Sequence, residues 1–174
     1  MTTQLNREIK AFCPDFDPIR DILRSHGASY VEEKEQVDYY YNLPDPVMQD
    51  GTRRLKVRLE NNNAQVVYYV EGVEAGARTS RFQVWGLNGA QTKEMLDAAL
   101  GVKAVVRKQR ELWIKDNVKF NLDQVETIGQ VLEVEILSQD GLDIEAQLEE
   151  YLGLFNPHLD EHIVGSNEDL ARIS

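Results

Sequence analysis

The stretch RRLKVRLE, residues Arg53–Glu60, alternates basic and apolar side chains along its whole length. Residues i and i+2 of a β-strand project from the same face, so this stretch predicts a strand with one basic face and one apolar face. The cations in phase with one another are Arg54, Lys56 and Arg58. Lys and Arg side chains are the usual ligands of phosphate oxygens in proteins. The basic face is therefore a candidate anion-binding surface.

Three other stretches alternate in the same way but carry different charges. The side chains that share a face within each are Glu133 with Glu135, Lys108 with Arg110, and Asn6 with Glu8 and Lys10. Carboxylates bind divalent cations, whereas lysine and arginine bind phosphate oxygens. If the four charged faces converge, they form a site for a metal ion and a polyphosphate.

The alternation has two structural interpretations. In the first, helices cover the apolar faces, and the charged faces line a concave surface or the inside of a barrel. In the second, the charged faces meet solvent and carry scattered ion pairs, each of which adds little stability. Periodicity by itself favours the second interpretation.

Length and composition limit the classes of protein to consider. The 174 residues fit one domain, and 42% hydrophobic with 28% charged residues is ordinary for a soluble globular protein. The net charge of −11 argues against a nucleic-acid partner. The sequence contains no apolar run long enough for a membrane span and no apolar N-terminal signal stretch. A single cysteine, Cys13, suits a reducing cytoplasm and predicts a small core residue.

The pattern predicts eight strands and three helices. The strands are expected at Gln4–Phe12, Tyr30–Tyr41, Arg53–Glu60, Ala64–Glu71, Arg78–Trp85, Val102–Lys115, Val118–Val125 and Gln130–Leu137. Turn residues such as Asn61-Asn62-Asn63 and Asp116-Asn117 separate consecutive strands, and short turns imply antiparallel pairing. We therefore expect a large antiparallel sheet flanked by helices.

Each predicted helix has recognisable end signals. Asp17 reads as an N-cap followed by Pro18 in the first turn, and Gly27 closes that helix. The other two helices are predicted at Thr92–Leu100, ending at Gly101, and at Ile144–Leu152, ending at Gly153.

Short motifs also follow one another from Asn6 to about Leu170. They are Asn6-Arg7-Glu8-Ile9-Lys10, Gln36-Val37-Asp38-Tyr39-Tyr40-Tyr41, Leu55-Lys56-Val57-Arg58, Val106-Arg107-Lys108-Gln109-Arg110, Asn121-Leu122-Asp123-Gln124-Val125-Glu126-Thr127-Ile128-Gly129, Leu132-Glu133-Val134-Glu135 and Ser166-Asn167-Glu168-Asp169-Leu170. Each motif is unspecific alone. In this order and spacing they resemble the CYTH family of triphosphate tunnel enzymes, which includes class IV adenylate cyclases, thiamine triphosphatases and inorganic tripolyphosphatases.

The resemblance implies an α+β fold, a closed antiparallel β-barrel of about eight strands with helices packed outside. It implies a single domain over residues 1–174. In that family the charged faces point into the tunnel, where basic residues hold the triphosphate and acidic residues bind Mg²⁺ or Mn²⁺. The resemblance thus reverses the preference drawn from periodicity alone.

Residue roles carry over by position. The resemblance implies metal ligands at Glu8, Glu133 and Glu135, phosphate-binding residues at Arg54, Lys56, Arg58, Lys108 and Arg110, and catalytic residues at Lys10 and Asp123. Lys10 would lie near the reacting phosphate, and Asp123 would bind the metal or support the residues that do. Tyr39 and Tyr41 share a strand face and are expected in the core.

Four positions depart from the family pattern. Asn6 replaces a glutamate, Glu71 stands where a basic residue is usual, and Arg81 and Gln83 stand where a Glu-x-Glu pair is common. Three functions therefore stay open. They are a class IV adenylate cyclase acting on ATP, a thiamine triphosphatase or tripolyphosphatase, and a catalytically silent module that binds a nucleotide or polyphosphate. The cyclase resemblance also implies a homodimer.

Overall fold

A computed structural model describes residues 4–44, 53–61, 63–74, 77–86 and 89–171. Strands make up most of this part of the chain. Their bounds are β1 Gln4–Phe12, β2 Ser29–Tyr41, β3 Arg53–Glu60, β4 Asn63–Glu74, β5 Ala77–Gly86, β6 Val102–Lys115, β7 Val118–Val125 and β8 Gly129–Leu137. Every predicted strand is present, and its bounds lie close to the predicted ones.

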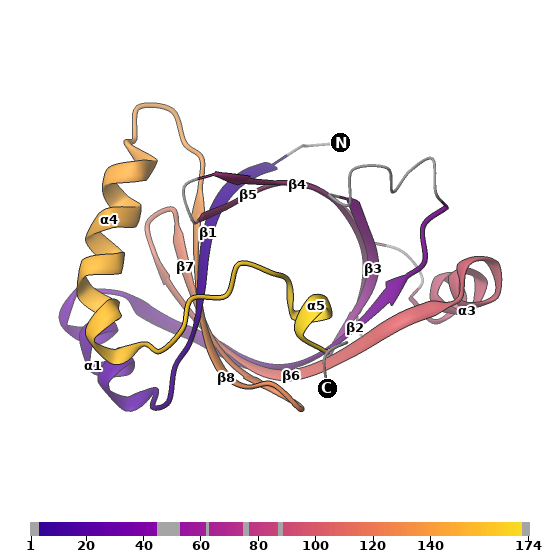
Figure 1. The fold of residues 1–174 in the computed structure, drawn as a ribbon, viewed down its shortest axis with the longest axis horizontal. Coiled ribbons are helices and arrows are strands. Elements are labelled where there is room, and N and C mark those ends of the chain that lie inside the picture. The colour runs from indigo at the N-terminus through magenta and orange to yellow at the C-terminus, as the bar shows by residue number, and fades with distance from the viewer. Residues whose placement is uncertain (1–3, 45–52, 62, 75–76, 87–88, 172–174) are drawn as a thin grey trace.

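All the strand pairs are antiparallel. Neighbouring strands follow the order β1-β5-β4-β3-β2-β6-β7-β8, and β1 is hydrogen-bonded on both edges, to β5 and to β8. The order therefore returns to its starting strand, and the sheet curls into the ring seen in Figure 1. The predicted large antiparallel sheet with flanking helices is confirmed.

The predicted turn residues take the backbone conformation that their chemistry allows. Asn61 between β3 and β4 has φ of 49°, and Asp116 between β6 and β7 has φ of 51°. Asn and Asp tolerate this left-handed region better than other residues with a Cβ atom. These turns keep consecutive strands adjacent in the ring.

The helices are α1 Asp17–Ser25, α3 Gly89–Leu100, α4 Ile144–Phe155 and α5 Asn167–Ala171, with a 3₁₀ turn η1 at Asn156–His158. Two predicted ends are wrong. Asp17 is the first helical residue rather than the N-cap, and its backbone N–H donates to Oδ1 of Asp15 at 2.9 Å. Gly153 lies inside α4, which continues to Phe155 because that ring packs into the core.

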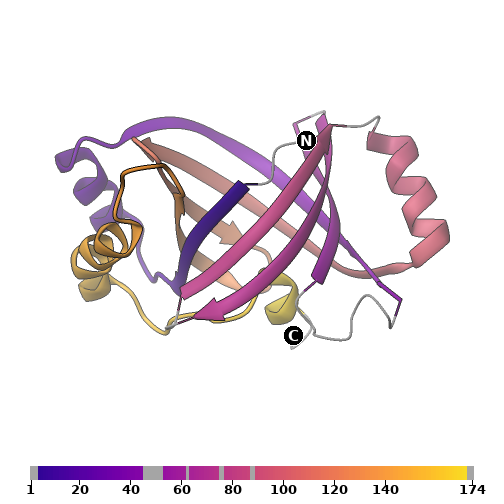
Figure 2. The ribbon, with the colours of Figure 1, turned by 90° about the horizontal axis from the view of Figure 1, so that it is seen from above.

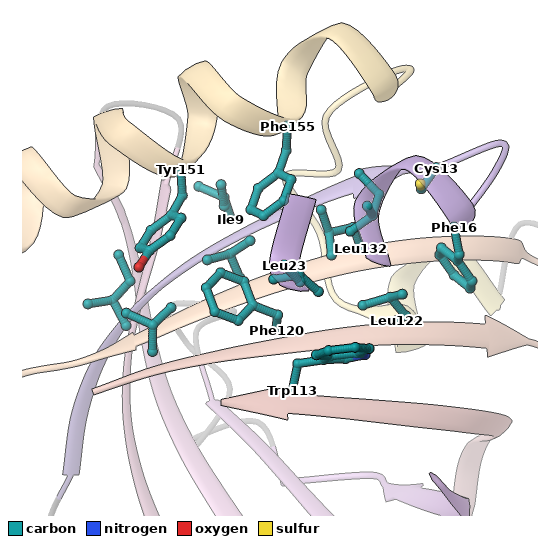
Figure 3. Close-up of a cluster of buried hydrophobic side chains, with 14 of the residues drawn as sticks. Ile9, Cys13, Phe16, Leu23, Trp113, Phe120, Leu122, Leu132, Tyr151 and Phe155 are labelled. Carbon is teal, nitrogen blue, oxygen red and sulfur yellow. The ribbon is translucent and has the colours of Figure 1, made fainter. Parts of the chain in front are cut away.

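The main hydrophobic core lies outside the ring, between the strands and the helices α1 and α4. Phe120 on β7 packs edge-on against Tyr151 and Phe155 of α4, with ring centroids 5.0 and 5.8 Å apart. Figure 3 shows these rings together with Leu23 of α1 and Leu132 of β8. Each of these side chains is buried. The predicted burial of Cys13 is confirmed in the same cluster.

Helix α3 covers another part of the outer surface, at the opposite end of the molecule from α1 and α4 (Figure 2). Leu96 and Leu100 pack against a buried cluster of Tyr41, Val57 and Val66, and the partly buried Tyr39 packs against the same cluster. The expectation of core packing is confirmed for Tyr41, whereas Tyr39 is only partly buried at the margin of this cluster. Both outer patches thus remove apolar strand faces from water, which leaves the charged faces to line the inside.

One end of the ring is filled by apolar side chains that point inward. Tyr40, Val106, Val125 and Val131 form a buried cluster, and Ala171 of α5 packs against it. In Figure 1, α5 and the segment before it lie across the opening. We call this cluster with α5 the closed end.

Among the helices that the structure describes, none is long and apolar enough to cross a membrane.

Candidate functional site

A polar cavity of about 370 Å³ lies inside the ring. Residues from all the strands line it, together with Ser166 and Asn167 before and at the start of α5. The residues predicted for the site that line it are Glu8, Lys10, Arg54, Lys56, Arg58, Lys108, Arg110, Glu133 and Glu135. Sequence alternation thus placed nine residues on one surface although they come from β1, β3, β6 and β8.

Asp38 on β2 is the centre of one group of charges. It lies directly opposite Arg58 of β3 in the strand register. Arg58 donates from Nε to Oδ1 and from Nη2 to Oδ2, each at 2.7 Å, and Nζ of Lys56 donates to Oδ2 at 2.7 Å. We call this arrangement the Asp38 fork. It holds two cations side by side at the cavity wall.

Asp123 on β7 is the centre of a second group with the same construction. It lies opposite Arg110 of β6, which donates from Nε to Oδ1 at 2.6 Å and from Nη2 to Oδ2 at 2.5 Å. Nζ of Lys108 donates to Oδ2 at 2.6 Å. Asp123 is fully buried and does not line the cavity. Its oxygens are occupied by this Asp123 fork, so it lies behind the cations rather than among them.

Burial changes the protonation of both forks. For the lysines burial is the largest influence, and together with the adjacent arginine it lowers the pKa of Lys56 and of Lys108 to about 8, although each aspartate opposes the change. Burial acts to raise the pKa of Asp38, but Arg58 and Lys56 outweigh it and hold that pKa well below its ordinary value. The forks are therefore cationic at neutral pH.

Glu133 connects the Asp123 fork to β1. Its Oε2 accepts from Nη2 of Arg110 at 2.6 Å, and its Oε1 lies 2.9 Å from Nζ of Lys10. Nζ of Lys10 lies 3.3 Å from Oε1 of Glu8. Burial acts to raise the pKa of Glu133, but Lys10, Lys108 and Arg110 hold it well below its ordinary range. Glu133 is thus an ionised carboxylate in a network of cations.

The wall formed by β1 and β8 has the donor chemistry of a cation site. Glu8 and Glu135 are directly paired across these strands, and both line the cavity. Like charges in this register destabilise a sheet unless a cation offsets them. Nδ2 of Asn6 donates to Oε1 of Glu135 at 2.6 Å, and Oδ1 of Asn6 is buried without a hydrogen-bond partner.

Carboxylate and amide oxygens are the ligands that Mg²⁺ and related ions take from proteins. The residues present on this wall therefore fit a divalent cation in their chemistry. Within the described ranges, no group of three or more His, Cys, Asp or Glu side chains is arranged around a single point. Lys10 and Arg110 occupy the oxygens of Glu133 instead.

Sequence reasoning missed an apolar and aromatic part of the wall. Tyr69 of β4 and Phe82 of β5 line the cavity with ring centroids 6.0 Å apart, and Nζ of Lys56 lies 5.3 Å from the centroid of the Tyr69 ring. Phe82 and Val84 both line the cavity, so Gln83 has the opposite phase. The prediction that Gln83 replaces a family glutamate inside the cavity is therefore wrong, because Phe82 and Val84 take the positions that face the cavity. The side chains of Glu71 and Arg81 lie outside the described residues.

The closed end also carries charge, and the sequence suggested this only through the last motif. Glu168 is 1% exposed, and its oxygens lie 2.8 Å from Nζ of Lys103 and 3.4 Å from Nε of Arg54. Nη2 of Arg54 donates to Oδ2 of Asp169 at 2.7 Å. Burial raises the pKa of Glu168 to about 7, although Arg54 opposes the rise. Arg54 therefore joins α5 to the cavity.

Comparison with known families places the chain in one family. Residues 4–161 match the model of the CYTH domain. The chain belongs to the CYTH family. The match covers most of the chain, so the expected family membership is confirmed.

Individual relatives of this CYTH chain are distant. A protein of Methanocaldococcus jannaschii named "Putative adenylate cyclase MJ0240" is 26% identical over 147 residues, which is 83% of this chain and 84% of the relative. The PH1012 protein from Pyrococcus horikoshii superposes with a TM-score of 0.78 at 20% identity, over 95% of this chain and 98% of that one. The Hippeastrum protein HpAC1 superposes with a TM-score of 0.72 at 12% identity, over 98% and 95% of the two chains. These likenesses to solved structures concern the fold.

Proposed function

We propose that this CYTH protein is a metal-dependent enzyme that processes a triphosphate in the cavity, as a class IV adenylate cyclase that converts ATP to cyclic AMP and pyrophosphate. The observation that carries the proposal is the pair of cation forks that lie beside the carboxylates of β1 and β8 in one cavity. Phosphoryl chemistry depends mainly on positioning and charge neutralisation, which this combination supplies.

In this proposal the forks hold the phosphate oxygens. Arg58 and Arg110 offer planar guanidinium groups, while Lys56 and Lys108 act as point charges. Arg54 adds a cation beside the closed end, where Asp169 orients it.

Glu8, Glu133 and Glu135 are the proposed holders of Mg²⁺ or Mn²⁺, which would neutralise phosphate charge when bound. Asn6 would contribute its unpartnered amide oxygen beside them. Lys10, held between Glu8 and Glu133, would orient the phosphate that reacts. In the cyclase reaction the ribose 3′ hydroxyl attacks the α-phosphorus, and pyrophosphate leaves.

The apolar part of the wall favours a substrate with an organic group. Val67, Tyr69, Phe82 and Val84 line the same cavity as the forks. Inorganic tripolyphosphate has no group to pack against such residues, whereas a nucleoside triphosphate does. This wall supports ATP over a purely inorganic substrate.

A triphosphatase is the second candidate. The Hippeastrum protein HpAC1, whose fold this chain shares, is described as having a dominant triphosphatase activity. The same forks would hold the substrate, and water would attack the terminal phosphorus in place of the ribose hydroxyl. The two candidates differ in product rather than in the residues that bind the phosphates.

Turnover of ATP, thiamine triphosphate and tripolyphosphate, each with Mg²⁺ and with Mn²⁺, distinguishes the candidates. Cyclic AMP with pyrophosphate is the expected result. Orthophosphate as the product would replace the cyclase by the triphosphatase. If no substrate turns over while triphosphates still raise the melting temperature, the protein is a binding module and both enzymatic proposals fail.

A further inference from the structure

The Asp38 and Asp123 forks are two copies of one arrangement. Each uses a Lys-x-Arg pair on one strand and an aspartate opposite the arginine on an adjacent strand of the sheet. In each fork the same atoms meet: Nε and Nη2 of the arginine and Nζ of the lysine surround one carboxylate. The two copies come from separate pairs of strands, β2 with β3 and β6 with β7.

The carboxylate oxygens of the two aspartates accept hydrogen bonds from the lysine and arginine of the fork, so they are not available to a ligand. Both oxygens of each carboxylate accept hydrogen bonds within the fork, and Asp38 and Asp123 are 3% and 0% exposed. In both forks the Nη1 amino group of the arginine takes no part in the contact with the aspartate. Each fork thus contains two cations and one anion, and its excess positive charge is fixed in place.

The neighbours of the two forks differ. Arg110 also donates to Glu133, which connects the Asp123 fork to Lys10 and the carboxylates of β1 and β8. In the Asp38 fork, Nζ of Lys56 lies 5.4 Å from the ring centroid of Tyr40 and 5.3 Å from that of Tyr69. The Asp123 fork therefore contacts Glu133, which is proposed to hold the metal ion. The Asp38 fork is bordered by aromatic rings instead.

We propose that Asp38 and Asp123 are positioning residues that prepare two separate phosphoryl-binding subsites, and that only the Asp123 subsite is coupled to the reacting end through Glu133. This inference rests on the proposed binding of a triphosphate in the cavity. A buried ion pair adds little net stability, so stability alone gives no reason to bury six charges in this way. Fixed cations, in contrast, bind an anion without first losing side-chain freedom.

The test uses Asp38→Glu and Asp123→Glu, because glutamate keeps the charge that the buried cations need but displaces the carboxylate by one methylene. Asp97→Glu is the matched control, since Asp97 pairs with Lys93 and Tyr41 outside the cavity. Calorimetric titration with tripolyphosphate in EDTA measures binding without metal. We expect each fork variant to bind about tenfold more weakly, ~1.4 kcal/mol, and the control to bind as wild type.

Coupling to Glu133 is measured with a double-mutant cycle on the same binding constant. Asp123→Glu and Glu133→Gln should be non-additive by about fivefold, ~1 kcal/mol, whereas Asp38→Glu and Glu133→Gln should be additive. In turnover assays Asp123→Glu should lower kcat, while Asp38→Glu should raise KM and leave kcat unchanged. If the aspartates had only a structural role, neither the coupling energy with Glu133 nor the separation of effects between kcat and KM would be observed.

The outcomes separate the two levels of the proposal. Wild-type protein that binds neither tripolyphosphate nor ATP, in EDTA or with Mg²⁺, would remove the proposed function and this inference with it. Wild-type binding that neither fork variant weakens would overturn the inference alone. Equal coupling of both forks to Glu133 would overturn the assignment of the reacting end to the Asp123 subsite.

Discussion

On β7 and β8, side chains on both faces are buried, apolar ones toward the helices and charged ones toward the cavity. Phe120 and Leu132 on the outer face are 0% and 1% exposed, and Asp123 and Glu133 on the inner face are 0% and 7% exposed. Burial of the outer face removes apolar area from water and stabilises the fold by ~25 cal/mol per Å². Burial of the inner face removes charges from water, which costs free energy that ion pairs at best restore. Burial therefore stabilises the fold on the outer face, whereas on the inner face it needs another explanation, for which we propose ligand binding.

The outer face should give the largest effect on stability. Phe120→Ala removes the ring that contacts Tyr151 and Phe155, and it should lower the free energy of unfolding by ~3–5 kcal/mol. Urea denaturation measures the change. The apparent affinity of the folded fraction for tripolyphosphate should stay unchanged, because Phe120 does not line the cavity. A stable variant that no longer binds would contradict the separation of the two faces.

The inner face should give the largest effect on activity. Glu133→Ala combined with Glu135→Ala should abolish metal-dependent turnover, a loss of roughly 10³-fold or ~4 kcal/mol in activation free energy, while the protein stays folded. Turnover and circular dichroism on the same sample check both parts. Glu145→Ala is the control, because Glu145 pairs with Arg7 on the outside. Unchanged turnover in the double variant would remove both glutamates from the mechanism.

Protonation of the inner lysines should limit binding at high pH. The pKa of Lys56 and Lys108 is about 8 without ligand, so above that pH a bound phosphate requires proton uptake. After correction for the ligand's own protonation, affinity for tripolyphosphate should be constant well below pH 8 and fall as the pH rises through 8, by up to ~tenfold per pH unit for each lysine. Titration calorimetry from pH 6.5 to 9.5 measures it. Lys56→Arg should make the fall less steep, and a flat wild-type profile would contradict the shifted pKa values.

The closed end should give a smaller effect, and on stability rather than on binding. Here the neutral form of the side chain is the favourable one, whereas the lysines must be charged. The pKa of Glu168 is about 7 in the folded protein and lower when unfolded, so the folded state holds the proton more tightly. Its stabilising contribution is complete below about pH 4.5 and is lost as the pH rises through about 7. The free energy of unfolding of Glu168→Gln, relative to that of wild type, should therefore rise by ~1–3 kcal/mol from pH 5 to pH 8. Equal gains at both pH values in urea denaturation would show that the carboxyl titrates normally.

How much the sequence predicted differs between the same two faces. Alternation located the strands and grouped the charges of RRLKVRLE and QVLEVEIL on one face of each strand, but only the family resemblance predicted that these faces line a cavity. Asp38 was visible only as part of a motif, because its pairing with Arg58 depends on the register between β2 and β3. The phase of Phe82 and Gln83 was misjudged because apolar residues alternate weakly on β5. The charged contacts of α5 join residues more than sixty positions apart, and no local pattern encodes them.

The position of β1 in the ring has a consequence for how the protein is made. β1 leaves the ribosome before both of its hydrogen-bonded neighbours, β5 and β8. Its pairing with β8 waits for about 125 further residues, which at ~5–20 residues per second corresponds to roughly 6–25 s. Until β5 is made β1 has two free edges, and until β8 is made it has one; free edges favour pairing with other chains, and charged residues such as Glu8 and Lys10 oppose such contacts. We therefore expect the side chains proposed to serve the finished cavity to lower the tendency of the nascent strand to aggregate.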